Sequence, residues 1–147
     1  MKLKIKKLDP RAVIPEYKTE GAAGCDISVL LDSDREILER GKIKMFRTGF
    51  AAELKNGYEI QIRSRSGLSL KNGVIVLNAP GTVDSDYRGE ICLIVANLGA
   101  EDFVVENGMR LGQMVVARYE KADIEEVEEL SETKRGGGAF GSTGMTK

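Results

Sequence analysis

The stretch GVIVLNAPGTVDSDYRGEICLIVAN, residues 73–97, decides the fold prediction. It contains two continuous apolar runs, 73–77 and 91–96, which are typical of buried strands. A Pro80-Gly81 turn and a polar loop separate the two runs. The stretch therefore predicts two strands of a buried sheet, joined by a loop that is dense in functional groups.

More strands are predicted on either side of this stretch. Residues 2–6 and 58–62 alternate apolar and polar side chains, and 103–105 and 114–117 are further apolar runs. Turn signals that contain glycine recur between the runs at a spacing of about 8–12 residues. Residues 124–130 carry apolar side chains three apart, which predicts either a short helix or an edge strand. The whole pattern predicts one all-β domain, a barrel or a jelly-roll-like sandwich.

The composition excludes several kinds of site. The 147 residues include 22 basic and 23 acidic side chains, and this balance argues against a general nucleic-acid binder. The chain has no histidine, which excludes His-containing catalytic triads and His-ligated metal sites. Cys25 and Cys92 do not have the spacing of a zinc site and are predicted to be small buried hydrophobes.

The sequence also contains no recognisable membrane or export signal. The N-terminus, MKLKIKKLDP, has no long apolar core, so it is not a signal peptide. No apolar run approaches the roughly 18 residues of a membrane span. We therefore expect a cytoplasmic protein that binds neither nucleic acid nor membrane.

Two stretches in the first half of the chain contain groups that suit a phosphate. GAAGCD has small residues that allow close backbone approach, and it ends at Asp26. RSRSG offers the guanidinium of Arg65, the hydroxyl of Ser66 and the backbone N–H of Gly67 in consecutive positions. The residues that follow predict a short helix whose first amides face an anion. Each stretch alone also fits a simple turn or a solvated loop.

Two later stretches supply a candidate base and a buried amide. The loop VDSDYRGE contains Asp84 and Asp86, and in a chain without histidine an aspartate is the natural general base. RLGQMVVARYE reads as a strand with Gln113 among apolar residues, and a buried glutamine needs hydrogen-bond partners. Alone, these stretches also fit a charged hairpin loop and ordinary core structure.

The last stretch is the glycine-rich RGGGAFGSTG, which begins at Arg135. It partly resembles a P-loop but lacks the lysine and the following helix, so a P-loop is rejected. Glycine-rich backbone amides together with the hydroxyls of Ser142 and Thr143 can still wrap a phosphate chain. The composition changes after Leu130, and residues 131–147 are predicted to be mobile when nothing is bound.

In this order, the five stretches resemble the motifs of the dUTPase (dUTP pyrophosphatase) family of trimeric all-β enzymes. The resemblance implies a jelly-roll-like distorted β-barrel, residues 1–130, and a flexible C-terminal lid, residues 131–147, that closes over the active site. It implies hydrolysis of dUTP to dUMP and pyrophosphate, which limits uracil incorporation into DNA and supplies dUMP for thymidylate synthesis. It also implies Mg²⁺ held mainly by the triphosphate, and a homotrimer whose active sites are shared between subunits.

The resemblance also implies a role for each motif residue. Asp84 would activate the water that attacks the α-phosphorus, Asp26 would orient Mg²⁺ through its waters, and Tyr87 would pack beneath the deoxyribose and exclude a 2′-hydroxyl. The other residues implied to bind substrate are Arg65, Ser66, Gly67, Gln113, Arg135, Ser142 and Thr143 at the phosphates, and Asn78, Val83, Phe140 and Gly141 at the uracil or in the lid. The strand from Asn78 to Val83 would read the base edge through its backbone.

Three positions depart from the family's pattern, and two alternative functions remain open. Cys25 stands where the family often has an aromatic or aliphatic residue, which looks tolerable. Ser64 replaces a frequent proline and is expected to loosen its turn. Ala139 replaces a glycine and would resist a positive φ if that position needs one. The first alternative is dCTP deaminase, alone or as a bifunctional deaminase-dUTPase, but its glutamate base is absent from the strand at 91–97. The second is a non-catalytic barrel that binds nucleotide, against which Asp84 and the tail argue.

Overall fold

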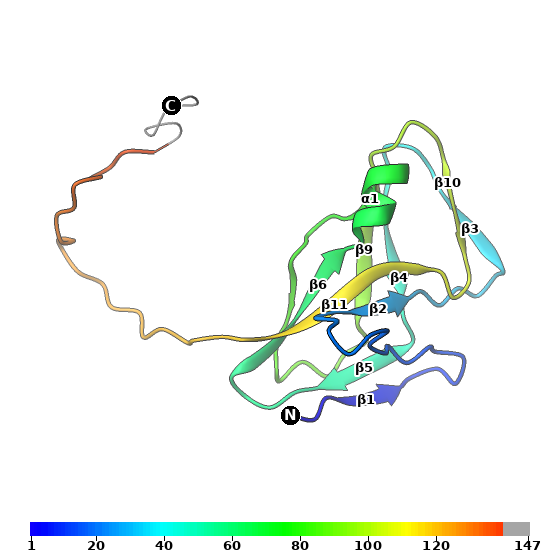
Figure 1. Cartoon of the computed structure of the whole chain (residues 1–147), viewed down its shortest axis with the longest axis horizontal. Helices are drawn as coiled ribbons and strands as arrows, with labels where there is room; N and C mark the ends of the chain where they lie inside the picture. Colours follow the sequence, from blue (N-terminus) through cyan, green and yellow to red (C-terminus); the bar gives the residue numbers. More distant parts are fainter. Residues whose placement is uncertain (140–147) are drawn as a thin grey trace.

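The computed structural model describes residues 1–139 as an all-β domain with one short helix (Figure 1). The elements are β1 (Lys4–Lys7), β2 (Cys25–Ser28), β3 (Arg35–Leu38), β4 (Ile43–Arg47), β5 (Phe50–Glu53), β6 (Tyr58–Ser64), α1 (Ser66–Asn72), β7 (Val74–Val76), β8 (Gly81–Val83), β9 (Cys92–Asn97), β10 (Phe103–Glu106) and β11 (Arg110–Arg118). They form the antiparallel sheets β1–β5, β3–β10, β4–β9–β7 and β2–β11–β6–β8. The jelly-roll-like β fold is confirmed. Across residues 1–139, no helix is long and apolar enough to cross a membrane.

The runs predicted as strands all form strands. In β6 the alternating pattern places Ile60 and Ile62 in the core, and the apolar run that follows α1 becomes β7. The prediction for residues 124–130 is wrong, because they form neither a helix nor a strand. Ile124 there is 98% exposed, so no core packs against the segment, and helices this short need such packing to form.

The hydrophobic core lies inside the barrel. Burying one of its large side chains stabilises the fold by about 1.5–3 kcal/mol. The largest fully buried side chains are Phe46, Phe50, Ile27, Leu38, Ile60, Leu93, Leu111 and Met114. They come from β2, β3, β4, β5, β6, β9 and β11. The core therefore depends on long-range strand pairing rather than on any one segment.

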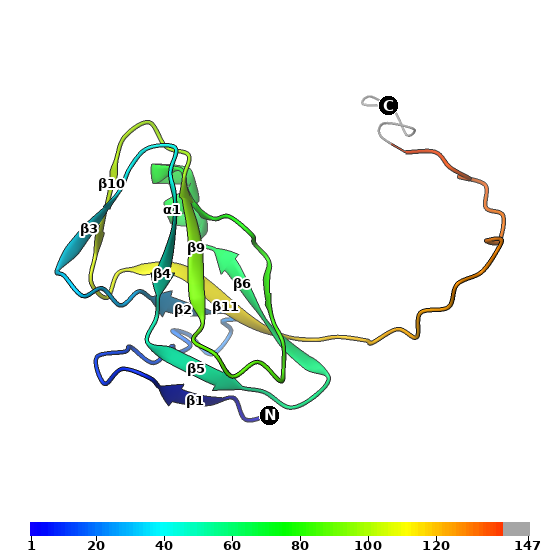
Figure 2. The same cartoon turned by 180° about the vertical axis from the view of Figure 1, so that it is seen from behind.

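The sheet β4–β9–β7 buries only one of its faces within this chain. Leu93 and Val95 of β9 point into the core, whereas Ile94 between them is 38% exposed. Strands β4 and β9 lie side by side (Figure 2). Their register places Ile94 beside Met45 of β4, which is 63% exposed. A continuous apolar strand normally has both of its faces covered. The described part of one chain therefore leaves an apolar sheet face without a cover.

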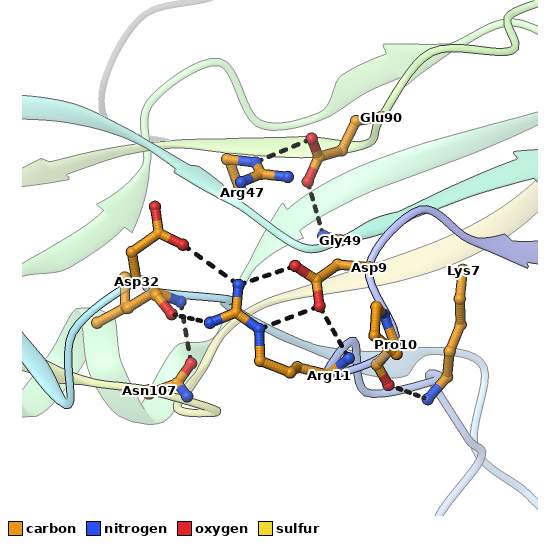
Figure 3. A network of polar contacts seen from close by, with 10 residues as sticks. Lys7, Asp9, Pro10, Arg11, Asp32, Arg47, Gly49, Glu90 and Asn107 are labelled. Atoms are coloured by element: carbon orange, nitrogen blue, oxygen red, sulfur yellow. Dashed lines mark hydrogen bonds and ion pairs between the residues drawn. The ribbon is translucent and has the colours of Figure 1, made fainter.

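A polar network fastens the segment before β2 to the barrel (Figure 3). The Arg11 guanidinium donates to Asp9 at 2.8 Å and to Asp32 at 3.2 Å, and the pair with Arg11 lowers the pKa of Asp9 to about 2. Nearby, Glu90 accepts a hydrogen bond from the backbone N–H of Gly49 at 2.7 Å. Glu90 ends the loop that joins β8 to β9, so this bond fixes one end of that loop.

Asn97 at the end of β9 is a buried polar side chain whose replacement tests this packing. It is 0% exposed, donates from Nδ2 to the carbonyls of Leu38 and Glu101 at 2.9 Å each, and accepts from the N–H of Gly99 at 2.9 Å. Asn97→Ala leaves these backbone groups without partners and is expected to cost about 2–4 kcal/mol of unfolding free energy.

Thermal unfolding measures this loss as a melting temperature lower by about 5–15 °C. Asn72→Ala is the matched control, because Asn72 is exposed, and it is expected to change stability by less than about 0.5 kcal/mol. Equal melting temperatures for the two variants would contradict the structural role of Asn97.

Candidate active site

Three charged side chains meet at one end of the sheet β2–β11–β6–β8. Asp26 on β2 accepts at Oδ1 from Arg65 Nε, 3.0 Å away, and at Oδ2 from Arg110 Nη1, 3.0 Å away. Arg65 also donates from Nη1 to the backbone carbonyl of Arg110 at 2.8 Å. Two guanidinium groups and one carboxylate leave a net charge of +1. The cluster therefore has the charge and the donors to bind an anion.

Gln113 lies beside this cluster, at the centre of the sheet. Its Nε2 donates to the backbone carbonyl of Ser64 at 2.9 Å, which provides the partner that a half-buried amide needs. A Cβ at Gly24 would lie only 2.8 Å from Gln113 Oε1. The small residue in GAAGCD thus makes room for the glutamine side chain.

The turn that carries Arg65 is tied firmly to its neighbours. Ser64 Oγ accepts from the N–H of Val76 at 2.9 Å and contacts the Val76 carbonyl at 3.4 Å, so β6 is linked to β7. These bonds argue against the expected loosening of the turn by Ser64, which stays a prediction. The predicted short helix is confirmed as α1, and it starts at Ser66 and Gly67, which are exposed and whose first-turn N–H groups have no partner within the helix.

Asp84 and Tyr87 line a cavity that does not include the charged cluster. This cavity of about 290 Å³ is lined by Met45, Thr82, Val83, Asp84, Tyr87, Glu90, Ile91, Cys92 and Ile94. The Tyr87 hydroxyl donates to the Glu90 carbonyl at 3.1 Å. The Tyr87 ring lies so close to Gly89 that a Cβ there would be 2.3 Å from the phenol oxygen. Gly89 is therefore needed for this position of the ring.

Asn78 lies in the turn before β8 and not on a strand. The family resemblance implied a strand from Asn78 to Val83, but β8 begins only at Gly81, after the predicted Pro80-Gly81 turn. Pro80 has no backbone N–H to donate to a ladder, which explains the late start. The Asn78 side chain packs over Gly81, where a Cβ would lie 2.8 Å from Asn78 Nδ2. Asn78 thus lies in the turn that precedes β8, whereas Val83 ends that strand.

The base candidate and the charged cluster are far apart within one chain. Asp26 is in register, across β11, with Arg63 of β6, whereas Val83, next to Asp84, is in register with Ile60 of β6. Asp84 is one residue beyond Val83, so four residues along the strand and three strand spacings across the sheet separate it from Asp26 by about 20 Å. A single chain therefore does not bring Asp84 to the charged cluster.

The tail candidates fall in two groups. Residues 119–139 contain neither helix nor strand and run away from the barrel (Figures 1 and 2). Within this segment Arg135 donates from Nε to the carbonyl of Gly138 at 2.9 Å, and Ala139 is exposed. The other candidates, Phe140, Gly141, Ser142 and Thr143, lie outside the described residues.

Arg110 is the cluster residue that the sequence patterns did not indicate. In a regular strand, Arg110 and Gln113 would point to opposite faces because they are three residues apart. The pairing of β11 with β2 shifts register between Arg110 and Gly112, and such irregularities re-aim side chains. Sequence alternation therefore could not place Arg110 beside Asp26.

The cysteines behave largely as small hydrophobes. Cys25 is buried and Cys92 is half-buried, and both thiols are free. Burial raises the pKa of each thiol, which favours the neutral form.

The donor set fits a Mg²⁺ ion that keeps its waters. Across residues 1–139, no three His, Cys, Asp or Glu side chains gather as a metal site. Asp26 is the carboxylate in the charged cluster, and its oxygens have about four lone-pair sites, of which the arginines occupy two. The remaining sites can accept hydrogen bonds from metal-bound waters, as Mg²⁺ commonly keeps several waters beside substrate phosphates.

Comparison with known sequences identifies close relatives. Residues 11–144 match the family model described as dUTPase. The deoxyuridine 5'-triphosphate nucleotidohydrolase of Wolinella succinogenes is 54% identical over 146 residues, which is 99% of this chain and 96% of that protein. The protein of the same name from Helicobacter pylori is 48% identical over 147 residues, 100% of this chain and 99% of its own length.

Solved structures share the fold. The Staphylococcus bacteriophage 80alpha dUTPase with dUPNHPP aligns with a TM-score of 0.87 and 24% identity, covering 97% of this chain and 98% of the phage chain. A dUTPase mutant from phage phi11 of S. aureus, described with the coordination of a structural Mg(II) ion, aligns with a TM-score of 0.79 and 21% identity. It covers 90% of this chain and all of the phage chain.

Proposed function

The chain belongs to the dUTPase family, and from that premise we propose how its residues hydrolyse dUTP to dUMP and pyrophosphate. The enzyme is a dUTP diphosphatase. The observation that carries the mechanism is the cluster of Asp26, Arg65 and Arg110, which has a net positive charge. In it, Asp26 of GAAGCD and Arg65 of RSRSG meet Arg110. The cytoplasmic location of the protein stays a prediction from the sequence.

Asp84 acts as the general base. It takes a proton from a water whose oxygen attacks the α-phosphorus, and the bond from that phosphorus to the bridging oxygen breaks, so that pyrophosphate leaves. The Asp84 carboxylate is exposed and takes part in no ion pair among residues 1–139, which leaves it available for this proton. A positioned base of this kind is typically worth about 10²–10⁴-fold in rate.

The phosphates bind at the charged cluster. Arg65 donates to them from the N–H groups that Asp26 and Arg110 leave free, and Ser66 and Gly67 add a hydroxyl and a backbone N–H at the start of α1. Gln113 binds phosphate or the water network beside them. Mg²⁺, oriented through its waters by Asp26, supplies charge neutralisation to the triphosphate when bound. Arg135, Ser142 and Thr143 of the tail bind the outer phosphates.

The nucleoside binds at the cavity around Tyr87. The Tyr87 ring, held against Gly89, packs beneath the deoxyribose and excludes a 2′-hydroxyl. The uracil contacts Asn78 and the backbone up to Val83. A site built for specific hydrogen bonds rejects an analogue that leaves them unpaired by about 10⁴–10⁵-fold. The remaining substrate contacts, in the lid that residues 131–147 form, are Phe140 over the base and Gly141 beside it.

The active sites are shared between the three subunits of a homotrimer. A general base has to lie within about 3 Å, or one water, of the proton that it takes. Asp84 is about 20 Å from Asp26 of its own chain by strand register. Asp84 of one subunit therefore serves the cluster of another.

Two apolar surfaces support this assembly. The outer face of β4–β9–β7, with Met45 and Ile94, has no cover among residues 1–139. Beyond β11, Ile124 and Leu130 are exposed among acidic residues, and a groove of about 340 Å³ beside β1 carries the opposite charge. The residues that line the groove are Lys4, Ile5, Lys6, Leu8, Ala51, Ala52, Glu53 and Arg88. A second copy is the partner whose acidic segment fits that groove.

Substitution of Asp84 tests the reaction and its base together. The wild type is expected to release pyrophosphate from dUTP with Mg²⁺, much faster than from dCTP or UTP. Asp84→Asn is expected to lower kcat by at least about 10²-fold and to leave dUTP binding nearly unchanged, because only the proton acceptor is lost. Pyrophosphate release and calorimetric binding measure the two effects.

Asp86→Asn is the matched control, since Asp86 is an exposed carboxylate two residues away and is expected to keep its activity within a few-fold. Unchanged turnover in Asp84→Asn rules out Asp84 as the base. Ammonia release from dCTP would instead point to the deaminase, and tight dUTP binding without turnover in the wild type would point to a non-catalytic module.

Truncation after Lys134 tests the lid. The shortened chain is expected to lose most of its kcat/KM, because Arg135 and the residues after it no longer cover the phosphates. Its melting temperature should stay close to that of the full chain, since residues 119–139 contain no strand or helix. The control is truncation after Gly144, which keeps RGGGAFGSTG intact. Equal activity in all three proteins contradicts the lid role.

Mixing two inactive variants tests the sharing of sites. Asp84→Asn and Arg65→Gln are each expected to be nearly inactive as homotrimers. Refolded together, they are expected to recover activity, because some sites then combine an intact Asp84 from one subunit with an intact Arg65 from another. Each variant refolded alone is the control. Mixed trimers, verified by tags of different mass, that stay inactive would place Asp84 and Arg65 in the same subunit's site.

A further inference from the structure

The loop between β8 and β9 ends at Glu90, and four residues around the end of β4 and the start of β9 tie this end down. Glu90 accepts at Oε1 from the N–H of Gly49 at 2.7 Å and at Oε2 from Arg47 Nε at 3.1 Å (Figure 3). The carbonyl of Ile91, the next residue, accepts from the hydroxyl of the fully buried Thr48 at 2.6 Å. The end of the loop is therefore held against the end of β4 through both a side chain and the backbone.

Glu90 also holds the Tyr87 ring. The Tyr87 hydroxyl donates to the backbone carbonyl of Glu90 at 3.1 Å, and the Tyr87 N–H donates to the carbonyl of Asp84 at 3.2 Å. Tyr87 is 47% exposed among residues 1–139, so packing alone does not fix its ring there. Tyr87 and Glu90 line the same cavity of about 290 Å³. The position of the ring at this cavity thus depends on where Glu90 lies.

Arg47 belongs to this set but to none of the five motif stretches. It is the last residue of β4. Its side chain is 46% exposed and that of Glu90 is 20% exposed, and an ion pair this close to the surface adds little to stability. Its effect on geometry is larger, because Arg47 binds the carboxylate oxygen that Gly49 leaves free. Both oxygens of Glu90 therefore have a fixed partner.

We propose that Glu90, held by Arg47 and Gly49, is a positioning residue that keeps the Tyr87 ring where it excludes a 2′-hydroxyl. This inference rests on the proposed function, in which Tyr87 packs beneath the deoxyribose. A ring excludes a hydroxyl sterically only while it cannot move aside, and a displacement of about 1 Å is enough to change the rate at an active site by about 10²-fold. Discrimination between dUTP and UTP therefore depends on Glu90 and Arg47 as well as on the ring.

The ratio of kcat/KM for dUTP to kcat/KM for UTP separates this role from a structural one. Pyrophosphate release from both substrates is measured on the wild type, Glu90→Ala and Glu90→Gln. A purely structural loss lowers the amount of active enzyme and changes both values by the same factor. Glu90→Ala is expected to lower the ratio by about 10-fold, because it removes a charge-assisted hydrogen bond and an ion pair. Glu90→Gln keeps an acceptor for Gly49, so its ratio should lie between the two.

Arg47→Gln tests the ion pair by itself and is expected to lower the ratio by about two- to fivefold. Glu36→Ala is the matched control. Glu36 of β3 pairs with Lys44, which lies three residues before Arg47 on β4, and its side chain is 30% exposed. This substitution removes an acidic partner from the same strand at a site that does not line the cavity of Tyr87. Its ratio should stay within about twofold of the wild type.

A wild-type ratio in Glu90→Ala would overturn the inference. An equal fall in Glu36→Ala would also overturn it, because that result indicates a general loosening of β4. If Glu90→Ala does not fold, Glu90→Gln decides by the same comparison.

Tyr87→Phe shows whether the effect passes through the ring. It removes the hydroxyl that is bound to the Glu90 carbonyl. Residues that act through one contact have non-additive effects, so Glu90→Ala should change the ratio less in the Tyr87→Phe background than in the wild type. Equal changes in the two backgrounds would contradict the positioning of Tyr87 by Glu90.

The proposed function fails separately from this inference. Release of pyrophosphate from dUTP by the wild type tests the reaction without reference to Glu90 or Arg47, and a wild type that releases none overturns both. A wild type that prefers dUTP to UTP, beside a Glu90→Ala variant with the same ratio, retains the function and removes only the positioning role.

Discussion

Strand β11 pairs with β2 along one edge and with β6 along the other, and the charged cluster depends on this double pairing. The pairing places Asp26 beside Arg65, at the end of β6, and beside Arg110, at the start of β11. These residues are 39 and 84 positions further along the chain. Side-chain contacts alone would not hold three partly exposed charges in one arrangement, because ion pairs near the surface contribute little. The ladder of backbone hydrogen bonds fixes the positions, and the ion pairs then orient the side chains.

The same pairing accounts for the irregularity at Arg110. Where β11 leaves β2, the register shifts between Arg110 and Gly112, and the arginine turns toward Asp26. Gly112 also packs closely, since a Cβ there would lie 3.1 Å from Leu93. The strand is therefore regular where it forms the core and irregular where it meets the site.

The incompleteness of the single chain is a second constraint. Among residues 1–139, the outer face of β4–β9–β7 has apolar side chains without a cover, and residues 119–139 leave the barrel without a core of their own. In the proposed trimer, contacts between subunits account both for these two surfaces and for the separation of Asp84 from Arg65 within one chain. Assembly would complete both the packing and the active site, because an isolated subunit would carry the phosphate cluster without a base beside it.

The sequence by itself determined the strands with strong patterns, such as β6 and β9, because alternation and apolar runs follow directly from which faces are buried. It also indicated most of the chemistry: Asp26, Arg65, Asp84 and Gln113 stand in motifs whose residue types suit phosphate hydrolysis. Local patterns failed where packing decides. Residues 124–130 have a helical spacing but no partner surface among residues 1–139, and they form neither helix nor strand.

Only the tertiary structure decided which of these groups meet. Strand register joins Asp26 to Arg65, adds Arg110 through a local shift, and keeps Asp84 on the far side of the same sheet. No spacing along the chain encodes these distances, because pairing between β2, β6 and β11 is long-range and depends on the core that all of them share.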